Sequence, residues 1–154
     1  MITVAVGTFI RGFDDLVRAA DGLGREGFAQ IGHSAFRPQH LEWACFLPQT
    51  ELFDRLRRSE LLIGHAGMGL IGDGLRAGCR LIVVPRRGAI GPGNPINDQR
   101  AFARRLASML PITVCEDLQQ LPDTVRRVLD GPRPGPTRRR SNVPELIAGF
   151  LARG

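Results

Sequence analysis

The stretch that decides the fold is Leu61-Leu62-Ile63-Gly64-His65-Ala66-Gly67-Met68-Gly69-Leu70-Ile71-Gly72-Asp73-Gly74-Leu75. It opens on a short apolar strand pattern, and from about Gly69 it predicts a helix that runs to Ala77 and stops at Gly78. Glycines at such a turn let a ligand approach the main chain, and free N–H groups at a helix start favour a phosphate. The turn therefore predicts a diphosphate cradle, the alternative being glycines that serve only close packing. It is neither a GxGxxG fingerprint nor a P-loop.

Strand and helix patterns alternate on both sides of this stretch. Strand patterns cover residues 2–7, 28–32, 43–47, 61–63, 81–84 and 112–115, and helix patterns cover 13–20, 50–56, 69–77, 98–109 and 121–129, with Thr50 as a capping residue. Strands separated by helices pair in parallel through right-handed crossovers. The sequence therefore predicts a Rossmann-like α/β fold with a doubly wound parallel sheet, whose ligands bind at the carboxyl ends of the strands.

Composition excludes several classes of protein. The chain has 154 residues, 43% apolar and 23% charged, which is typical of one globular domain and untypical of a disordered chain or a membrane bundle. No apolar run approaches the roughly 20 residues that span a bilayer, and residues 1–8 do not have the pattern of a secretory signal, so we expect a cytoplasmic protein. The net charge of +6, all of its basic residues being arginine, suits an acidic ligand or anionic lipid. Nucleic acid is not expected, because basic and aromatic residues are not interleaved.

The chain divides by composition into three parts. Residues 1–130 carry the alternating pattern, 131–140 form a Pro/Gly/Arg-rich linker, and 141–154 predict a C-terminal helix that either docks on a partner or folds back on its own domain. Cys45, Cys79 and Cys115 have no CxxC spacing and sit in or beside apolar segments, so buried reduced thiols are expected and a metal site is not.

Several motifs together indicate a family. His65-Ala66-Gly67, with Asp73 eight residues after the histidine, resembles the donor-nucleotide motif of GT-B glycosyltransferases. The chain is also similar to the C-terminal domain of glycosyltransferase family 28 over roughly residues 1–110. The stretches that carry this similarity, besides the motif at 65–73, are residues 6–8, 30–34, 81–86 and 97–99. The resemblance is nearest to the small single-domain, donor-binding subunits of two-part UDP-sugar transferases. These include bacterial exopolysaccharide glucuronosyltransferase components and the catalytic subunit of the eukaryotic dolichol-linked N-acetylglucosamine transferase.

The resemblance implies a role for each matched position. The diphosphate-binding set is Gly7, Thr8, Gly67, Met68, Gly69 and Leu70, with His65 as the catalytic group that stabilises the diphosphate. It further implies that Asp73 binds the ribose, that Phe46 and Leu47 border the uracil, and that Asn97, Asp98 and Gln99 read the donor sugar. Departures from the family pattern are Asp73 where glutamate is usual, Gly64 where serine is usual, and Gln99-Arg100 where His-Gln often stands.

Each site residue also has an ordinary structural interpretation. His65 can simply complete a strand end, and Asp73 can pair with Arg76 or Arg100. Arg86 and Arg87 follow a buried strand, where they either meet a diphosphate or uronic carboxylate or form a solvated pair in a loop.

The resemblance implies half of an enzyme, since the chain has the length of one domain of a two-domain transferase. We expect the donor-binding subunit of an inverting UDP-sugar glycosyltransferase, with the base and a lipid-linked saccharide acceptor on a separate membrane-associated subunit that holds this chain at the cytoplasmic membrane. The UDP-sugar is a substrate, and neither a cofactor nor an obligatory metal is expected. The alternative is a non-catalytic nucleotide-sugar binding or regulatory module; a self-contained epimerase is not favoured, because it needs a second domain in the same chain.

Overall fold

A computed structural model describes residues 1–88 and 98–136 of the chain. Its sheet has six parallel strands in the order β3-β2-β1-β4-β5-β6. These strands are β1 (Ile2–Ala5), β2 (Gly27–Gln30), β3 (Glu42–Ala44), β4 (Leu61–His65), β5 (Arg80–Val84) and β6 (Thr113–Val114). The predicted doubly wound, Rossmann-like α/β fold is confirmed.

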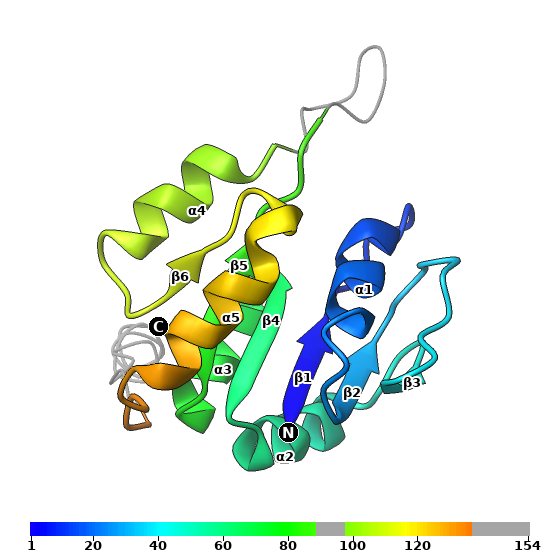
Figure 1. The fold of residues 1–154 in the computed structure, drawn as a ribbon, viewed down its shortest axis with the longest axis horizontal. Coiled ribbons are helices and arrows are strands. Elements are labelled where there is room, and N and C mark those ends of the chain that lie inside the picture. The colour runs from blue at the N-terminus through cyan, green and yellow to red at the C-terminus, as the bar shows by residue number, and fades with distance from the viewer. Residues whose placement is uncertain (89–97, 137–154) are drawn as a thin grey trace, which may run out of the picture.

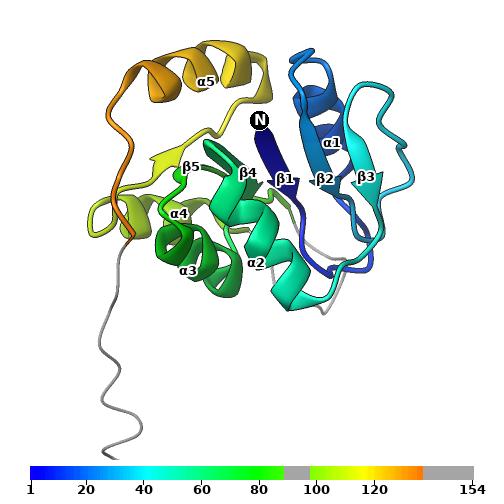
Figure 2. The same ribbon diagram turned by 90° about the horizontal axis from the view of Figure 1, so that it is seen from below.

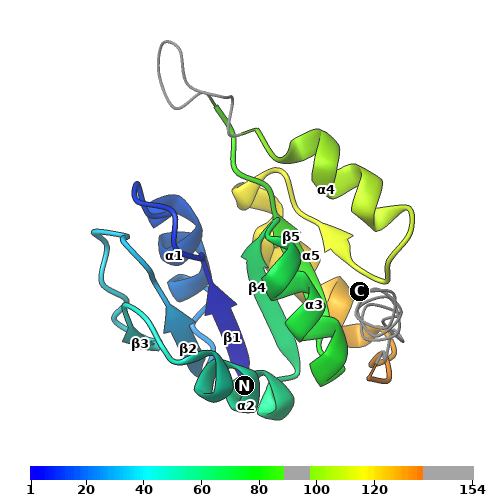
Figure 3. The same cartoon turned by 180° about the vertical axis from the view of Figure 1, so that it is seen from behind.

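Helices cover both faces of this sheet (Figures 1, 2 and 3). They are α1 (Asp14–Asp21), α2 (Gln49–Arg58), α3 (Met68–Ala77), α4 (Arg100–Ala107) and α5 (Leu121–Asp130), the last preceded by the 3₁₀ turn η1 (Leu118–Gln120). Helices α1 and α5 lie on one face, and α2 and α3 lie on the other (Figure 2).

Alternation along each strand divides the core between the two faces. In β4, Leu61 and Ile63 pack with the residues of α1 and α5, whereas Leu62 packs with those of α2 and α3. Burial on both faces explains why the central strands read as continuous apolar runs instead of alternating ones.

Two element ends differ from the sequence prediction, and a third agrees with it. Helix α3 ends as predicted, since Gly78 adopts the left-handed conformation at φ 71°. The strand expected at 43–47 stops at Ala44, and the amide of Leu47 instead donates to Gln30 Oε1 at 3.1 Å. The prediction that Thr50 caps a helix is wrong, because α2 begins at Gln49 after Pro48.

The predicted linker begins as an ordered strap, residues 131–136, at the amino ends of β4 and β5. Arg80 donates to the Gly131 carbonyl at 2.6 Å, and Arg133 donates to the carbonyls of Gly78 and Ser59, each at 3.0 Å. The rest of the linker and the predicted helix at 141–154 lie outside the described residues.

Two further sequence expectations concern burial and the membrane. Cys79 and Cys115 are buried and Cys45 is half-buried, all three as free thiols, which agrees with the prediction of reduced cysteines. Within 1–88 and 98–136, every helix is too short or too polar to cross a bilayer.

Candidate functional site

The candidate site lies where the winding of the sheet reverses. Strand β1 pairs with β2 on one side and β4 on the other. From β1 the chain leaves toward α1, and from β4 it leaves toward α3 on the opposite face (Figures 1 and 3). The connections that follow these two adjacent strands thus leave toward opposite faces of the sheet, and ligands of doubly wound sheets bind at the strand ends where the winding reverses in this way.

His65 stands at this point, at the end of β4. Its imidazole packs between Gly7, which follows β1, and Gly67, which precedes α3. A Cβ atom on Gly7 would lie 2.5 Å from His65 Cε1, and one on Gly67 would lie 2.2 Å from His65 Nε2. Both glycines are therefore required by the histidine ring itself, whether or not a ligand approaches them.

The surroundings of His65 favour its neutral form. Burial lowers its pKa below the ordinary value, the positive charge of Arg86 lowers it further, and the carbonyl of Ala5 acts in the opposite direction. Within the described part of the chain, Nδ1 is buried and makes no hydrogen bond of normal geometry. A neutral imidazole can donate or accept one hydrogen bond but adds no charge to the site.

The N-terminus of α3 presents main-chain amides beside this ring. Gly67 is the N-cap residue, and the next three residues, 68–70, supply the first amides of the helix, which have no acceptor within it. A Cβ atom on Gly69 would have no neighbour within 4 Å, so the space above it is open. The side chain of Leu70 fills the position next to Gly64, where a Cβ atom would lie 2.5 Å from its Cδ2. The glycine that replaces the family's usual serine at residue 64 thus makes room for Leu70.

Asp73 lies two turns into α3 and is only 7% exposed. Its Oδ1 accepts a hydrogen bond from Arg76, whose guanidinium carbon also sits 5.2 Å from the centre of the Phe53 ring. Of the two partners weighed from sequence, the structure selects Arg76, since Arg100 pairs with Asp98. The carboxylate is held in place by a half-exposed cation, and within residues 1–88 and 98–136 the contact to this cation is made by Oδ1.

The segment after β3 supplies an exposed aromatic ring. Phe46 is 46% exposed, and the ring of His33 meets its edge with centroids 5.0 Å apart. Gln30, at the end of β2, fixes the neighbouring Leu47 through the side-chain bond already described. From the sequence, neither Gln30 nor His33 was assigned a role at the site. Gln30 ends β2 and His33 follows it, and a position at the carboxyl end of a strand could have marked both as candidates.

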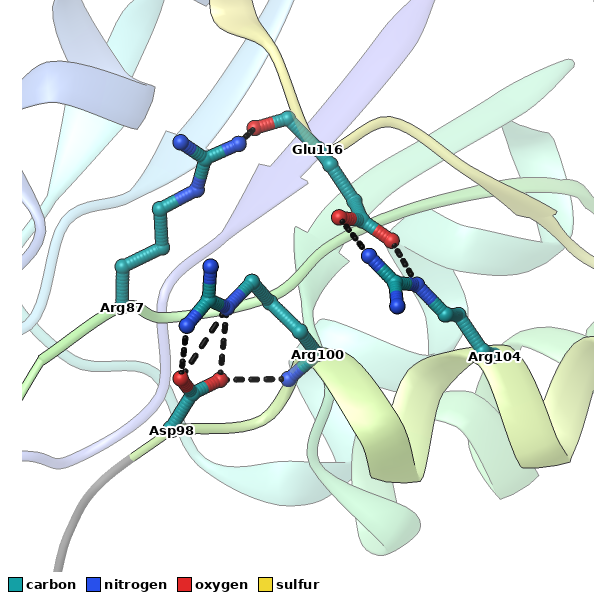
Figure 4. A network of polar contacts seen from close by, with 5 residues as sticks. All are labelled: Arg87, Asp98, Arg100, Arg104 and Glu116. Atoms are coloured by element: carbon teal, nitrogen blue, oxygen red, sulfur yellow. Dashed lines mark hydrogen bonds and ion pairs between the residues drawn. The ribbon is translucent and has the colours of Figure 1, made fainter.

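The segment after β5, helix α4 and the loop after β6 contribute arginines and acids to one network of polar contacts (Figure 4). Asp98 accepts from the main-chain amide of Arg100 at 3.0 Å and pairs with its guanidinium. Glu116 receives Arg104 on its carboxylate and Arg87 on its main-chain carbonyl. Hydrogen bonding to Arg100 lowers the pKa of Asp98 to about 2, so this expected sugar-reading group is ionised at neutral pH.

Arg86 and Gln99 take structural positions within the same loops. Arg86 is buried and its guanidinium donates to the carbonyls of Val6 and Gly12, so it is neither a solvated loop residue nor presented to a ligand. Gln99 Oε1 accepts from the amide of Arg86 at 3.2 Å. Asn97 lies outside the described residues.

Comparison with known proteins gives this arrangement a family. Residues 1–145 match the glycosyltransferase family 28 C-terminal domain, so the chain belongs to that family. It is similar to the crystal structure of the glycotransferase of kitacinnamycin, with a TM-score of 0.64 and 18% identity over 85% of this chain and 35% of that one. It is also similar to MurG of Acinetobacter baumannii, with a TM-score of 0.57 and 14% identity over 99% of this chain and 50% of that one. No curated protein matches the sequence.

These structural likenesses concern the fold alone, because both identities are low. The chain spans from about a third to a half of the length of these two relatives. It corresponds to the donor-binding domain of a GT-B glycosyltransferase, as its family and fold define it.

Proposed function

We propose that this chain binds the UDP-sugar donor of an inverting glycosyltransferase, and that the acceptor is a lipid-linked saccharide held by a separate membrane-associated subunit. The family membership supports donor binding, and the separate acceptor subunit rests on the small donor-binding subunits of two-part transferases that the sequence resembles. A role in exopolysaccharide or glycan biosynthesis follows from the small subunits that the sequence resembles.

The observation that carries the proposal is the open N-terminus of α3 beside His65. Free amides at residues 68–70 and the positive end of the helix dipole suit a diphosphate, and among the residues that the structure describes no packing neighbour explains Gly69. Gly7 lies against the ring of His65 and Thr8 follows it in the chain, and in this proposal Asp73 supplies a carboxylate oxygen for the ribose. Phe46, with its exposed ring, and Leu47 complete the base end of the proposed site.

The chemistry divides between the two partners. A base on the acceptor side takes the proton of an acceptor hydroxyl, whose oxygen attacks the anomeric carbon as the bond to the diphosphate oxygen breaks. The UDP that leaves carries the new negative charge, and the amides at the start of α3 stabilise it together with a hydrogen bond from neutral His65. This chain therefore contributes leaving-group stabilisation, with no metal among the groups we assign to the step. Glucuronate is our first candidate for the donor sugar because Arg87 stands exposed after β5; glucose and N-acetylglucosamine follow.

Calorimetry of the chain with UDP, NAD and RNA tests the binding half of the proposal. We expect UDP alone to bind, and Asp73→Ala to weaken it by about tenfold or more, which is about 1.4 kcal/mol. Asp123→Ala is the matched control, since Asp123 is an exposed acid on α5. Equal UDP affinity in wild type and Asp73→Ala would contradict the assigned ribose contact.

Co-expression with a membrane-associated subunit encoded by a neighbouring gene tests the catalytic part of the proposal. We expect transfer from one UDP-sugar of a panel to a lipid-linked acceptor only when both chains are present. UDP binding with no transfer under these conditions would favour the alternative, a non-catalytic nucleotide-sugar binding or regulatory module.

A further inference from the structure

Arg86 is a buried cation that makes all its contacts inside the protein. Only 7% of the residue is exposed, and its guanidinium carbon lies 4.9 Å and 4.5 Å from the ring centres of Phe9 and Phe13. Nη2 donates to the Val6 carbonyl at 2.7 Å, and Nη1 donates to the Gly12 carbonyl. One side chain from the end of β5 thus holds both ends of the turn that follows β1.

The main chain of Arg86 is joined in turn to the start of α4. Gln99 donates its amide to the Arg86 carbonyl at 3.0 Å and receives the Arg86 amide on Oε1 at 3.2 Å. The Gln99 carbonyl then accepts the Ala103 amide at 2.8 Å inside α4. A continuous series of hydrogen bonds therefore runs from the first turn of the fold, through Arg86, to α4.

Resting on the proposed function, we propose that Arg86 is a positioning residue that clamps the turn at 6–12 to the start of α4, so that the phosphate-facing and sugar-facing segments keep one spacing. Arginine suits this task because its planar end carries donors for two carbonyls while it also lies against two aromatic rings. Lysine has a compact ammonium that cannot serve both carbonyls and both rings in that geometry.

The charge of the clamp acts on His65 as well. Burial lowers the pKa of Arg86 to about 10, which leaves it positive at neutral pH. Among the described residues, the influences resolved on His65 besides burial are this charge and the Ala5 carbonyl. Arg86 therefore helps to keep the imidazole neutral while it holds the neighbouring turn.

Two substitutions separate the charge from the geometry. Arg86→Lys keeps a cation but loses the paired contacts, and Arg86→Met keeps an apolar stem and loses both. Arg55→Met is the matched control, because the Arg55 guanidinium also stacks on a ring, Phe28 at 3.9 Å, away from the site.

Nuclear magnetic resonance of the full chain without ligand tests the clamp through two quantities, the pKa of His65 and the exchange rate of the Gly12 amide. Only three histidines are present, so His65→Gln assigns the His65 signal. We expect the His65 pKa to rise in Arg86→Met and to stay low in Arg86→Lys, and Gly12 amide exchange, normally slowed by its bond to the Phe9 carbonyl, to accelerate in both. UDP should bind at least about tenfold more weakly to both variants than to the wild type and Arg55→Met.

The clamp is wrong if both folded variants keep wild-type Gly12 exchange and wild-type UDP affinity. If Arg86→Met does not fold, Arg86→Lys and Gln99→Leu, which removes the Oε1 acceptor, decide the question by the same two measurements. If the wild type itself does not bind UDP, the proposed function fails, and Gly12 exchange with the His65 titration still confirms or rejects the clamp.

Discussion

Gly69 and Gly72 lie three residues apart in α3, and a Cβ atom on either would meet no atom within 4 Å. Alanine at either position restricts the unfolded chain and favours the helix. The free energy of unfolding of each variant should therefore exceed that of the wild type by up to about 1 kcal/mol. If a diphosphate approaches the first amides of α3, only Gly69→Ala obstructs it. Calorimetry with UDP should find weaker binding in Gly69→Ala and unchanged binding in Gly72→Ala; equal affinities would mean that the cradle lies elsewhere.

Asp98 gives a pH dependence whose sign follows from its partner. Its pKa in the folded protein is about 2, below the value of an ordinary aspartate, chiefly because Arg100 donates to it. The stabilisation is therefore fully present above about pH 4 and disappears as the pH falls through about 2. Carboxyl resonances followed from pH 5 to 1.5 should show this midpoint, and Arg100→Met should return it toward the ordinary value.

The sequence suggested candidate site residues and a role for each, but not the contacts that hold them in place. His65, Gly67 and Asp73 stand out by spacing along one segment. The reason for Gly7 lies in His65, which is distant in the chain, whereas the reason for Gly64 lies in Leu70, within the same strand-turn-helix segment. Arg86 is the clearest case, because its carbonyl partners at Val6 and Gly12 are 80 and 74 residues away and no local pattern signals them.

The ends of helices and strands were predicted correctly from the sequence in several cases where the residues that cause them are close in the chain. The left-handed end of α3 at Gly78 and the strands 61–65 and 80–84 follow from residues within a few positions. The end of β3 was not predicted, because the amide of Leu47 donates to the side chain of Gln30, which is 17 residues away. The start of α2 was predicted wrongly although its cause is local, since Pro48 takes the N-cap position and Thr50 falls inside the helix.

Helix α3 is held close to the sheet by Gly74. A Cβ atom there would lie 2.8 Å from Leu62 and 3.0 Å from Leu81, two side chains that are each 2% exposed. Overpacking of this kind costs about 1–3 kcal/mol. We expect Gly74→Ala to lose that much unfolding free energy relative to Gly72→Ala, which adds the same methyl group to the same helix in open space. Urea denaturation of the two variants measures the difference; equal midpoints would mean that the interface between α3 and the sheet yields easily.

In the whole molecule, the two ends of the parallel strands have different roles, and we refer to them as the carboxyl edge and the amino edge of the sheet. The carboxyl edge holds the residues assigned to the donor, and the amino edge holds the strap at 131–136. A cavity of about 360 Å³ lies at this amino edge, between the strap, β5 and α5. Its lining includes Arg80, which donates to a main-chain carbonyl of the strap, and Arg133, which donates to the carbonyls of Ser59 and Gly78 at the ends of α2 and α3. We therefore assign the strap to stability and the donor to the opposite edge.

Arg133→Met tests this separation. The substitution leaves the Gly78 and Ser59 carbonyls without a charged donor, so the free energy of unfolding should fall by about 1.5–3 kcal/mol. Arg126→Met is the control, because Arg126 forms an exposed pair with Asp123 that contributes little. UDP at about 100 times its Kd should then stabilise all three proteins by the same amount, about 2.7 kcal/mol. A smaller increment in Arg133→Met would mean that the strap reaches the donor site through the sheet, because a ligand stabilises a variant less only when it binds that variant more weakly.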